Sequence, residues 1–251
     1  MPDRLNGKVA VITGASTGIG LATAKVFAAE GARIFITGRR KAALDRAVDE
    51  IGHNATSIQA DSANLDDLDR LYGRVKAEVG RIDILFANAG GGGLLPLGQI
   101  TEEQVDDTFG RNVKGVIFTV QKALPLMGEG GSILLTGSTA GSGGTAAFSV
   151  YSASKAAVRN LARSWALDLK GSGIRVNVIS PGPVRTPGLV ELAGEDAARQ
   201  QDLLDHFATL IPLGRVGEAE EIAKAALFLA SDDASFVNGA ELFADGGAAQ
   251  V

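Results

Sequence analysis

Residues 8–31, KVAVITGASTGIGLATAKVFAAEG, carry the clearest indication of the fold. Its first residues are mostly apolar and predict a buried strand over 8–13, and residues 19–29 have the spacing of an amphipathic helix. Gly14, Gly18 and Gly20 lie where this strand passes into the helix. Glycine allows a tight turn and lets a ligand approach the backbone closely, and the free N–H groups at a helix start attract phosphate. The turn therefore predicts a dinucleotide site, although turns favour glycine anyway and G-x-x-x-G-x-G differs from the widespread G-x-G-x-x-G.

The alternation of strand and helix continues along the chain. Short apolar runs predict further strands at 33–37, 56–60, 82–87, 132–136, 174–180 and 240–243. Longer amphipathic segments predict helices near 40–51, 65–79, 101–127, 150–170 and 218–230. Such an alternation implies a parallel sheet with helices on both faces, and right-handed crossovers make it doubly wound. We expect an α/β fold with about seven strands, forming a single domain over residues 1–251.

One late segment departs from this rhythm. Residues 181–210 begin PGPVRTPG, contain no strand pattern and resume a helical pattern only weakly. Long segments of this kind often cover a functional site, so we expect a substrate lid at about 185–212, with a surface excursion of no role as the alternative. The apolar side chains that would form either a pocket wall or the core of the lid are Phe148, Leu189, Val190 and Leu192.

Composition narrows the class of protein. The 251 residues include 45% hydrophobic residues, enough for a sizeable core, and a formal net charge of −5 with no dense basic stretch. We therefore expect no nucleic-acid partner. Cysteine is absent, which excludes disulfide and thiol chemistry, and the polar start MPDRLNGK predicts neither a signal peptide nor a membrane span. We expect a cytoplasmic protein, and His53 and His206, which lack carboxylates at metal spacing, indicate no metal site.

The end of the second predicted strand indicates the choice of cofactor. An acidic residue there would bind the ribose 2′-hydroxyl of NAD, but this chain has Gly38, Arg39 and Arg40. A guanidinium can form two hydrogen bonds to a phosphate, so we expect NADP(H), with Arg39 as the main contact. The alternative is that both arginines begin a solvated helix face. Asp61, after the third predicted strand, could accept a hydrogen bond from an adenine amino group, cap the next helix or close a turn.

Tyr151 and Lys155 stand four residues apart in YSASK and share one face of the helix predicted over 150–170. Ser138 ends the preceding strand and can reach the same place. A tyrosine with a pKa of about 10 needs a fall of about 3 units, or roughly 4 kcal/mol, to exchange protons near neutrality. A lysine cation at about 5 Å supplies ~0.8 kcal/mol in water but ~3 kcal/mol at an effective dielectric near 20. The pair thus predicts a proton donor that is shielded from solvent. The alternative is that Tyr151 and Lys155 only pack on the helix. We assign such a packing role to Tyr72.

Seven motifs in order give the chain a resemblance to the short-chain dehydrogenase/reductase family over essentially its whole length. They are TGASTGIG, ANAG at 87–90, the asparagine of RNVKG, Ser138, YSASK, PGPVRT and the terminal DGG. The resemblance implies a Rossmann-like fold, a nicotinamide cofactor, transfer of the pro-S hydride, and a homotetramer. One departure is Ala87, where many members have asparagine; another is Ser16 and Thr17, where some NADP-preferring members have a basic residue.

The resemblance also implies roles for individual residues. Tyr151 is the general acid and base, Lys155 binds the nicotinamide ribose and lowers the tyrosine pKa, and Ser138 holds the substrate oxygen. Asn112 supports a water path to Lys155. The expected cofactor contacts are Gly14, Ser16, Thr17, Gly18, Ile19, Gly20, Gly38, Arg39, Arg40, Asp61, Ser62, Asn88, Ala89, Gly90, Tyr151, Lys155, Pro181, Gly182, Val184 and Thr186.

Within the family, the stretches FITGRR, FTVQKALPLM and LGRVGEAEEIAKAALFLASDD look like NADPH-dependent secondary-alcohol dehydrogenases that accept bulky ketones. We therefore expect hydride transfer between NADP(H) and a ketone or secondary alcohol. A 3-oxoacyl-carrier-protein reductase is the alternative. Arg159, Arg163 and Lys170 could dock its acidic carrier, but the net charge is −5 and the lid is acidic. A non-catalytic NADPH-sensing protein is a third possibility, opposed by the complete catalytic set.

Overall fold

The computed structural model describes residues 3–251, and its centre is a sheet of seven parallel strands. The strands are β1 (Val9–Ile12), β2 (Arg33–Gly38), β3 (Ala55–Gln59), β4 (Ile84–Ala87), β5 (Ser132–Thr136), β6 (Arg175–Pro181) and β9 (Glu241–Ala244). Their order in space is β3-β2-β1-β4-β5-β6-β9, so the direction of winding reverses between β1 and β4. This confirms the predicted single-domain, doubly wound α/β fold.

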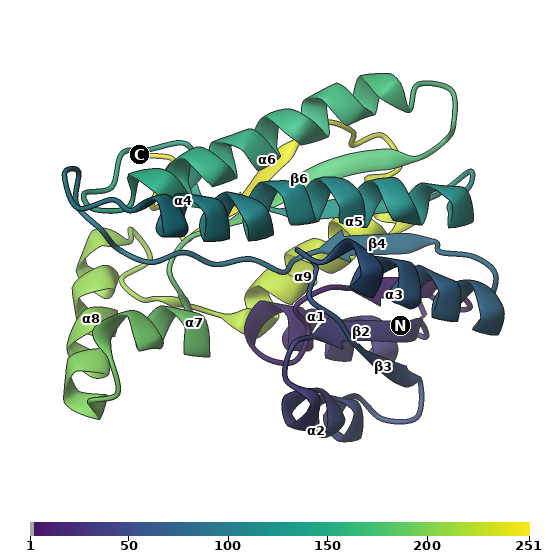
Figure 1. Cartoon of the computed structure of the whole chain (residues 1–251), viewed down its shortest axis with the longest axis horizontal. Coiled ribbons are helices and arrows are strands. Elements are labelled where there is room, and N and C mark those ends of the chain that lie inside the picture. Colours follow the sequence, from purple (N-terminus) through teal and green to yellow (C-terminus); the bar gives the residue numbers. More distant parts are fainter. Residues whose placement is uncertain (1–2) are drawn as a thin grey trace.

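Helices cover both faces of the sheet (Figure 1). One face packs against α1 (Gly18–Ala29), α2 (Lys41–Ile51) and α9 (Ala219–Ala230), and the other against α3 (Leu65–Glu78), α5 (Gly115–Ala123) and α6 (Ser149–Asp168). The two hydrophobic cores explain the consecutive apolar residues of β2. Ile34 and Ile36 belong to the first core, whereas Phe35, which points to the other face, belongs to the second.

The single helix expected over 101–127 is wrong in detail. The structure divides it into α4 (Glu102–Phe109), a π-helical turn (Gly110–Lys114), α5 and a 3₁₀ turn (Leu124–Leu126). Asn112, in the π turn, is fully buried and hydrogen bonds outside its own helix. These bonds favour the π turn at this point of the helix. Such turns occur mostly as single turns within α-helices and are frequent at functional sites. Pro125, which has no N–H to donate, accompanies the 3₁₀ turn that follows α5.

The predicted lid has more structure than its sequence pattern suggests. It contains β7 (Val184–Arg185), α7 (Pro187–Val190), a 3₁₀ turn (Glu191–Ala193) and α8 (Ala197–Leu210), and β7 pairs with β8 (Gly217–Glu218). Only Leu204 of α8 is buried, which explains the weak helical pattern. Leu204, Ile211 and Val216 form a small third core, separate from those of the sheet.

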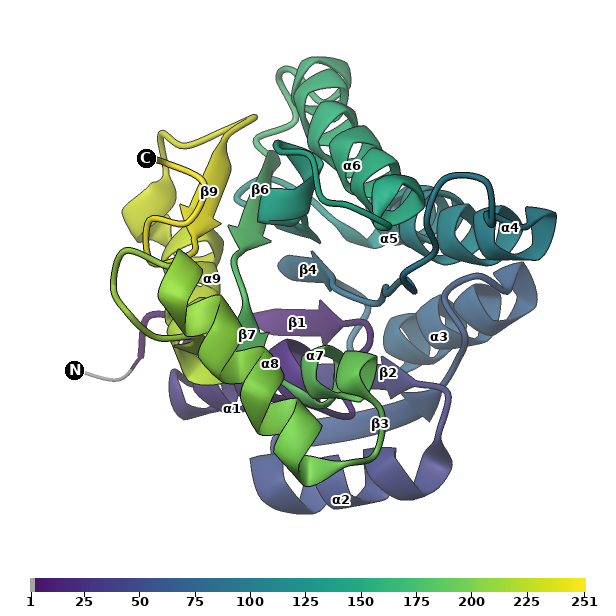
Figure 2. The same cartoon turned by 90° about the vertical axis from the view of Figure 1, so that its left-hand side faces the viewer.

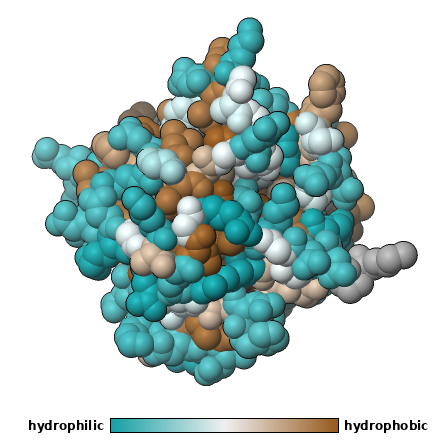
Figure 3. Space-filling model, turned by 90° about the vertical axis from the view of Figure 1, so that its right-hand side faces the viewer, coloured by the Kyte–Doolittle hydropathy of each residue, from teal (hydrophilic) through white to brown (hydrophobic). Residues whose placement is uncertain are grey.

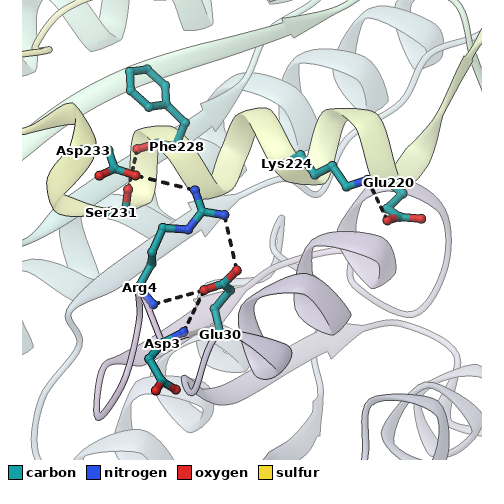
Figure 4. Close-up of polar contacts among 8 residues, drawn as sticks. All are labelled: Asp3, Arg4, Glu30, Glu220, Lys224, Phe228, Ser231 and Asp233. Atoms are coloured by element: carbon teal, nitrogen blue, oxygen red, sulfur yellow. Dashed lines mark hydrogen bonds and ion pairs between the residues drawn. The ribbon is translucent and has the colours of Figure 1, made fainter. Parts of the chain in front are cut away.

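The N-terminal segment is anchored to the layer that contains α1 and α9 (Figure 4). The Glu30 carboxylate accepts hydrogen bonds from the backbone N–H groups of Asp3 at 3.0 Å and Arg4 at 3.1 Å. The Arg4 guanidinium lies 3.3 Å from Glu30 and 3.5 Å from Asp233, which follows α9. The two backbone donors, followed by Arg4, lower the pKa of Glu30 from 4.5 to about 2.

Figures 2 and 3 look onto opposite ends of the molecule. Figure 2 shows the end where α7 and α8 lie, and Figure 3 shows the surface of the other end, which is largely hydrophilic with apolar residues scattered in it. In open α/β sheets, ligands bind outside the carboxyl ends of the strands. Of the helices within residues 3–251, none is long and apolar enough to cross a membrane.

Candidate active site

A cavity of about 920 Å³ lies at the carboxyl ends of the strands, beneath α7 and α8. Its lining brings together every expected site residue except Asn112. Residues just after six strands contribute to it, namely Gly14 after β1, Arg39 after β2, Ala60 after β3, Asn88 after β4, Ser138 after β5 and Gly182 after β6. Regions far apart in the sequence thus meet because parallel strands all end at one edge of the sheet.

The glycine turn packs so tightly against neighbouring backbone that no side chain fits at two of its positions. A Cβ at Gly14 would lie 2.8 Å from the Cα of Ala89, and Gly14 has a φ of +63°. A Cβ at Gly20 would lie 2.5 Å from the carbonyl oxygen of Gly14. Thr17, the N-cap residue of α1, makes no side-chain capping bond, and the first residues of the helix, Gly18, Ile19 and Gly20, line the cavity. This backbone can accept a pyrophosphate.

The turn after β4 locks three strand ends together. Thr13, fully buried, accepts hydrogen bonds at Oγ1 from the N–H groups of Asn88 and Ala89, both at 3.0 Å. The Asn88 amide donates to the carbonyl oxygens of Thr13 and Gly14 at 3.1 and 3.2 Å and accepts from Thr136 Oγ1 at 3.1 Å. Asn88 therefore bridges the ends of β1, β4 and β5, and these bonds leave its side chain little freedom to bind a ligand.

The edge of the cavity beyond β2 carries the expected arginines. Arg39 and Arg40 are exposed and both line the cavity. Gly38 is buried, and a Cβ there would lie 3.1 Å from Ser16 Oγ, so glycine leaves room between β2 and the glycine turn. The Arg39 carbonyl accepts a hydrogen bond from Gln59 Nε2 at 2.8 Å, which fixes the backbone while the guanidinium faces outwards.

Of the predicted alternatives for Asp61, the structure shows the closing of a turn and not the capping of the next helix. Its Oδ1 accepts a hydrogen bond from the Ala63 N–H at 2.9 Å, and its own N–H donates to Asp67 at 2.8 Å, so Asp61 closes the turn after β3. Asn64, not Asp61, caps α3, by accepting from the N–H groups of Asp66 and Asp67. Asp61 and Ser62 still line the cavity.

The residues of the predicted proton donor, Ser138, Tyr151 and Lys155, all line the cavity. Lys155 is almost fully buried, and its Nζ donates to the Thr136 carbonyl at 2.8 Å and lies 5.6 Å from the centre of the Tyr151 ring. Tyr151 is half-buried and stacks on Phe148 with ring centres 4.3 Å apart. Burial lowers the pKa of Lys155 from 10.5 to about 8. The ammonium form therefore prevails at pH 7.

The expected lowering of the Tyr151 pKa does not arise from the protein alone. Burial raises the pKa of this phenol, and a hydrogen bond with Ser138 opposes the rise only in part. The cost of burying the phenolate exceeds the stabilisation from this hydrogen bond. The side chains on their own keep Tyr151 protonated, in the form that can donate a proton.

Asn112 lies beside the cavity, not in its wall. Its Oδ1 accepts from the Gly91 N–H at 3.0 Å, and its Nδ2 donates to the Gly91 carbonyl at 3.0 Å and to Ser154 Oγ at 2.9 Å. Ser154 in turn donates to the Tyr151 carbonyl at 2.6 Å. The amide of Asn112 thus connects the segment after β4 to α6. This structural role differs from the water path to Lys155 that the family resemblance implies. Sequence reasoning missed Ser154, although it stands inside YSASK, and Thr13, although it directly precedes Gly14.

The predicted pocket-wall residues and Tyr72 can each be placed in the structure. Leu189, Leu192 and Phe148 line the cavity as expected of a pocket wall, whereas Val190 does not and packs in the lid core. Tyr72 is buried and donates to the Thr119 carbonyl at 2.6 Å, which confirms its packing role. Across residues 3–251, no cluster of three His, Cys, Asp or Glu side chains could hold a metal ion.

Comparisons with known proteins agree with this geometry. Residues 14–249 match the family model described as enoyl-(acyl carrier protein) reductase. The chain is 53% identical to oxidoreductase asL5 of Sarocladium schorii, covering 99% of this chain and 98% of that protein. It is 39% identical to a 3-oxoacyl-[acyl-carrier-protein] reductase of Thermotoga maritima (97% and 98% covered) and 35% identical to an NADP-dependent (R)-specific alcohol dehydrogenase of Lentilactobacillus kefiri (98% of each).

The solved structures point the same way. A short-chain dehydrogenase/reductase from Brucella melitensis superposes with a TM-score of 0.93, at 31% identity and with all of both chains covered. The protein is an oxidoreductase, and it belongs to the short-chain dehydrogenase/reductase family. This family uses a nicotinamide cofactor. The residues of this chain fit one, because the glycine turn and the first residues of α1 line the cavity, where backbone N–H groups at a helix start can hold a pyrophosphate.

Proposed function

We propose that this protein reduces ketones to secondary alcohols, and catalyses the reverse oxidation, with NADP(H) as cofactor. The observation that carries the proposal is one continuous cavity. Its lining includes Arg39 and Arg40, the group Ser138, Tyr151 and Lys155, and the apolar lid residues Leu189, Leu192, Leu203 and Phe207. Apolar lid side chains together with a few polar groups suit a small apolar ketone.

When bound, the nicotinamide supplies or accepts a hydride. In ketone reduction, Tyr151 donates its phenolic proton to the substrate oxygen while Ser138 donates a hydrogen bond to the same atom. In alcohol oxidation, Tyr151 takes the hydroxyl proton. The raised pKa of Tyr151 favours the neutral phenol, which suits reduction, and the ammonium of Lys155 stabilises the phenolate left behind.

The preference for NADP(H) rests on charge at the end of β2. Arg39 and Arg40 follow directly after the buried Gly38 and line the cavity, and no acidic residue stands at this strand end to bind a ribose 2′-hydroxyl. The relative from Lentilactobacillus kefiri, whose name includes NADP dependence, supports the same preference.

A reductase of carrier-bound 3-oxoacyl groups is the second candidate, favoured by the similarity to the Thermotoga maritima protein. It needs an exposed basic patch beside the cavity to dock an acidic carrier. Arg159 is paired with Glu241 at 2.6 Å, and the lid carries exposed Glu191, Glu195 and Asp196. These charges favour free ketones as substrates.

The proposal includes residues 185–212 as the substrate lid and a cytoplasmic homotetramer as the working form. α7 and α8 place Leu189 and Phe207 over the cavity on a small core that is separate from those of the sheet, which would let this segment move as a unit. Sedimentation of the purified protein would report the mass of the assembly and test for a tetramer.

Replacing Tyr151 by Phe tests the proposed chemistry. A set of ketones is offered with NADPH, and loss of the NADPH absorbance is followed. We expect turnover to fall by at least about 10³-fold, because the proton donor is lost, while NADPH binds as before. Unchanged turnover would exclude Tyr151 as the acid. Turnover of an acetoacetyl-carrier protein in preference to free ketones would favour the second candidate.

A further inference from the structure

The segment after β4 contains four consecutive glycines, Gly90–Gly93, and one of them touches the proton donor. A Cβ built on Gly92 would lie 2.7 Å from Cδ2 and 3.0 Å from Cβ of Tyr151. Gly92 does not have the left-handed φ that would itself demand glycine. Glycine is therefore needed at this position for space, since any side chain would displace the tyrosine ring.

Hydrogen bonds from the π turn and from α4 hold this segment on both sides of Gly92. Asn112 pairs with both backbone groups of Gly91, and Gln104 Nε2 donates to the Gly93 carbonyl at 3.1 Å. Gln104 lies on α4 and is half-buried, and its Oε1 has no hydrogen-bond partner among residues 3–251. The one directed bond of this side chain is therefore the one to Gly93.

A second contact limits the Tyr151 ring. Phe148 stacks on it with an interplanar angle of 20°. Ala147, just before Phe148, has a φ of +60°, a conformation that costs a residue with a Cβ about 1 kcal/mol, and its carbonyl accepts a hydrogen bond from the Leu95 N–H at 2.8 Å. The chain thus holds a strained residue where the segment after β4 meets the start of α6.

We propose that Gly92 is a positioning residue that fixes the orientation of the Tyr151 phenol, and that Gln104 holds Gly92 in place. The inference rests on the proposed role of Tyr151 as acid and base. A general acid must lie within about 2.6–3.2 Å of the atom that it protonates. A displacement near 1 Å can lower the rate by about 10²-fold. The contact at 2.7 Å leaves less room than a methyl group needs, so a methyl group at Gly92 would displace the phenol.

The test compares Gly92→Ala with Gly93→Ala. Gly93 adjoins Gly92, and a Cβ there would meet nothing within 4 Å. We expect kcat for oxidation of 2-butanol by NADP⁺ to fall about 10²-fold in Gly92→Ala and less than threefold in Gly93→Ala. The small alcohol avoids a clash between substrate and the new methyl group. Binding of NADPH, followed by fluorescence, and the melting temperature should stay near wild-type values in both variants.

The pH profile distinguishes positioning from a general loss of structure. In the oxidation direction kcat rises with pH as Tyr151 loses its proton. Both burial and the Ser138 hydrogen bond act on the pKa of this phenol, so a displaced ring moves the midpoint. We expect a displacement of at least half a pH unit in Gly92→Ala and none in Gly93→Ala. An unmoved midpoint, or a loss of NADPH binding parallel to that of kcat, would overturn the inference.

Gln104→Met is the second variant if Gly92→Ala does not fold, and Gln99→Met, at an exposed glutamine, is its control. Methionine keeps the length of the side chain but cannot donate to the Gly93 carbonyl, so kcat should fall about 3- to 10-fold with the same movement of the midpoint. Wild-type kcat in this variant would overturn the role of Gln104. An inactive wild type would overturn the proposed function and the inference with it, whereas an active wild type with an unaffected Gly92→Ala variant would overturn the inference alone.

Discussion

Lys155 should make the stability of this protein depend on pH in an unusual direction. Burial lowers the pKa of Lys155 from 10.5 to about 8, so the folded state binds its proton less tightly than the unfolded state does. Between pH 8 and pH 10.5 the unfolded state holds more protons, and the free energy of unfolding rises with pH. Below pH 8 the buried ammonium costs the folded state a constant amount. At about 1.4 kcal/mol for each pH unit, that amount is roughly 3 kcal/mol.

Lys155→Met removes this dependence, because methionine fills the same space without a charge. The variant also loses the hydrogen bond to the Thr136 carbonyl, which lowers its free energy of unfolding by a similar amount at every pH up to about 8. The informative quantity is therefore how the difference in free energy of unfolding between wild type and variant changes with pH. We expect the free energy of unfolding of the wild type to rise by about 2 kcal/mol relative to the variant between pH 7.5 and pH 10.

Denaturant unfolding of the cofactor-free protein at a series of pH values measures this difference. Lys170→Met, at an exposed lysine just beyond α6, controls for the loss of one positive charge. If the difference between wild type and Lys155→Met stays constant from pH 7.5 to pH 10, the buried-ammonium account of this site is wrong.

Two further predictions concern the cofactor and the N-terminal anchor. Arg39→Asp should move the ratio of kcat/KM for NADPH over NADH towards NADH by about 10²-fold or more, because a carboxylate repels a 2′-phosphate; an unmoved ratio would mean that Arg39 does not select the cofactor. Glu30→Gln should lower the free energy of unfolding at pH 7 by about 1 kcal/mol after allowance for solvent screening. The pKa of Glu30 is lowered to about 2, so this difference in free energy of unfolding should persist above pH 4.5 and shrink as pH falls towards 2. Acid denaturation curves measure it. A difference that does not depend on pH would contradict the contact of Glu30 with Asp3 and Arg4.

Most of the fold could be predicted because its signals are local. The run Ile34, Phe35, Ile36 indicates a strand covered on both faces, and the structure places these residues in two different cores. The break in the helix expected over 101–127 could not be predicted, because its cause is distant. Asn112 bonds to Gly91 and Ser154, which lie 21 and 42 residues away. The helix α8 was underestimated for a related reason, since its one buried residue, Leu204, packs on a small core that forms only within the folded lid.

The amino-acid sequence is sufficient to predict the alternation of strands and helices, the glycine turn after β1 and the pairing of Tyr151 with Lys155, because each depends on neighbours within about one turn of chain. The packing of Val190 against the lid core, the contact of Gly92 with Tyr151 and the raised pKa of Tyr151 are evident only in the folded structure. The physical reason is common to all three: burial and contact depend on which distant segments meet in the folded chain, and no local spacing encodes that meeting.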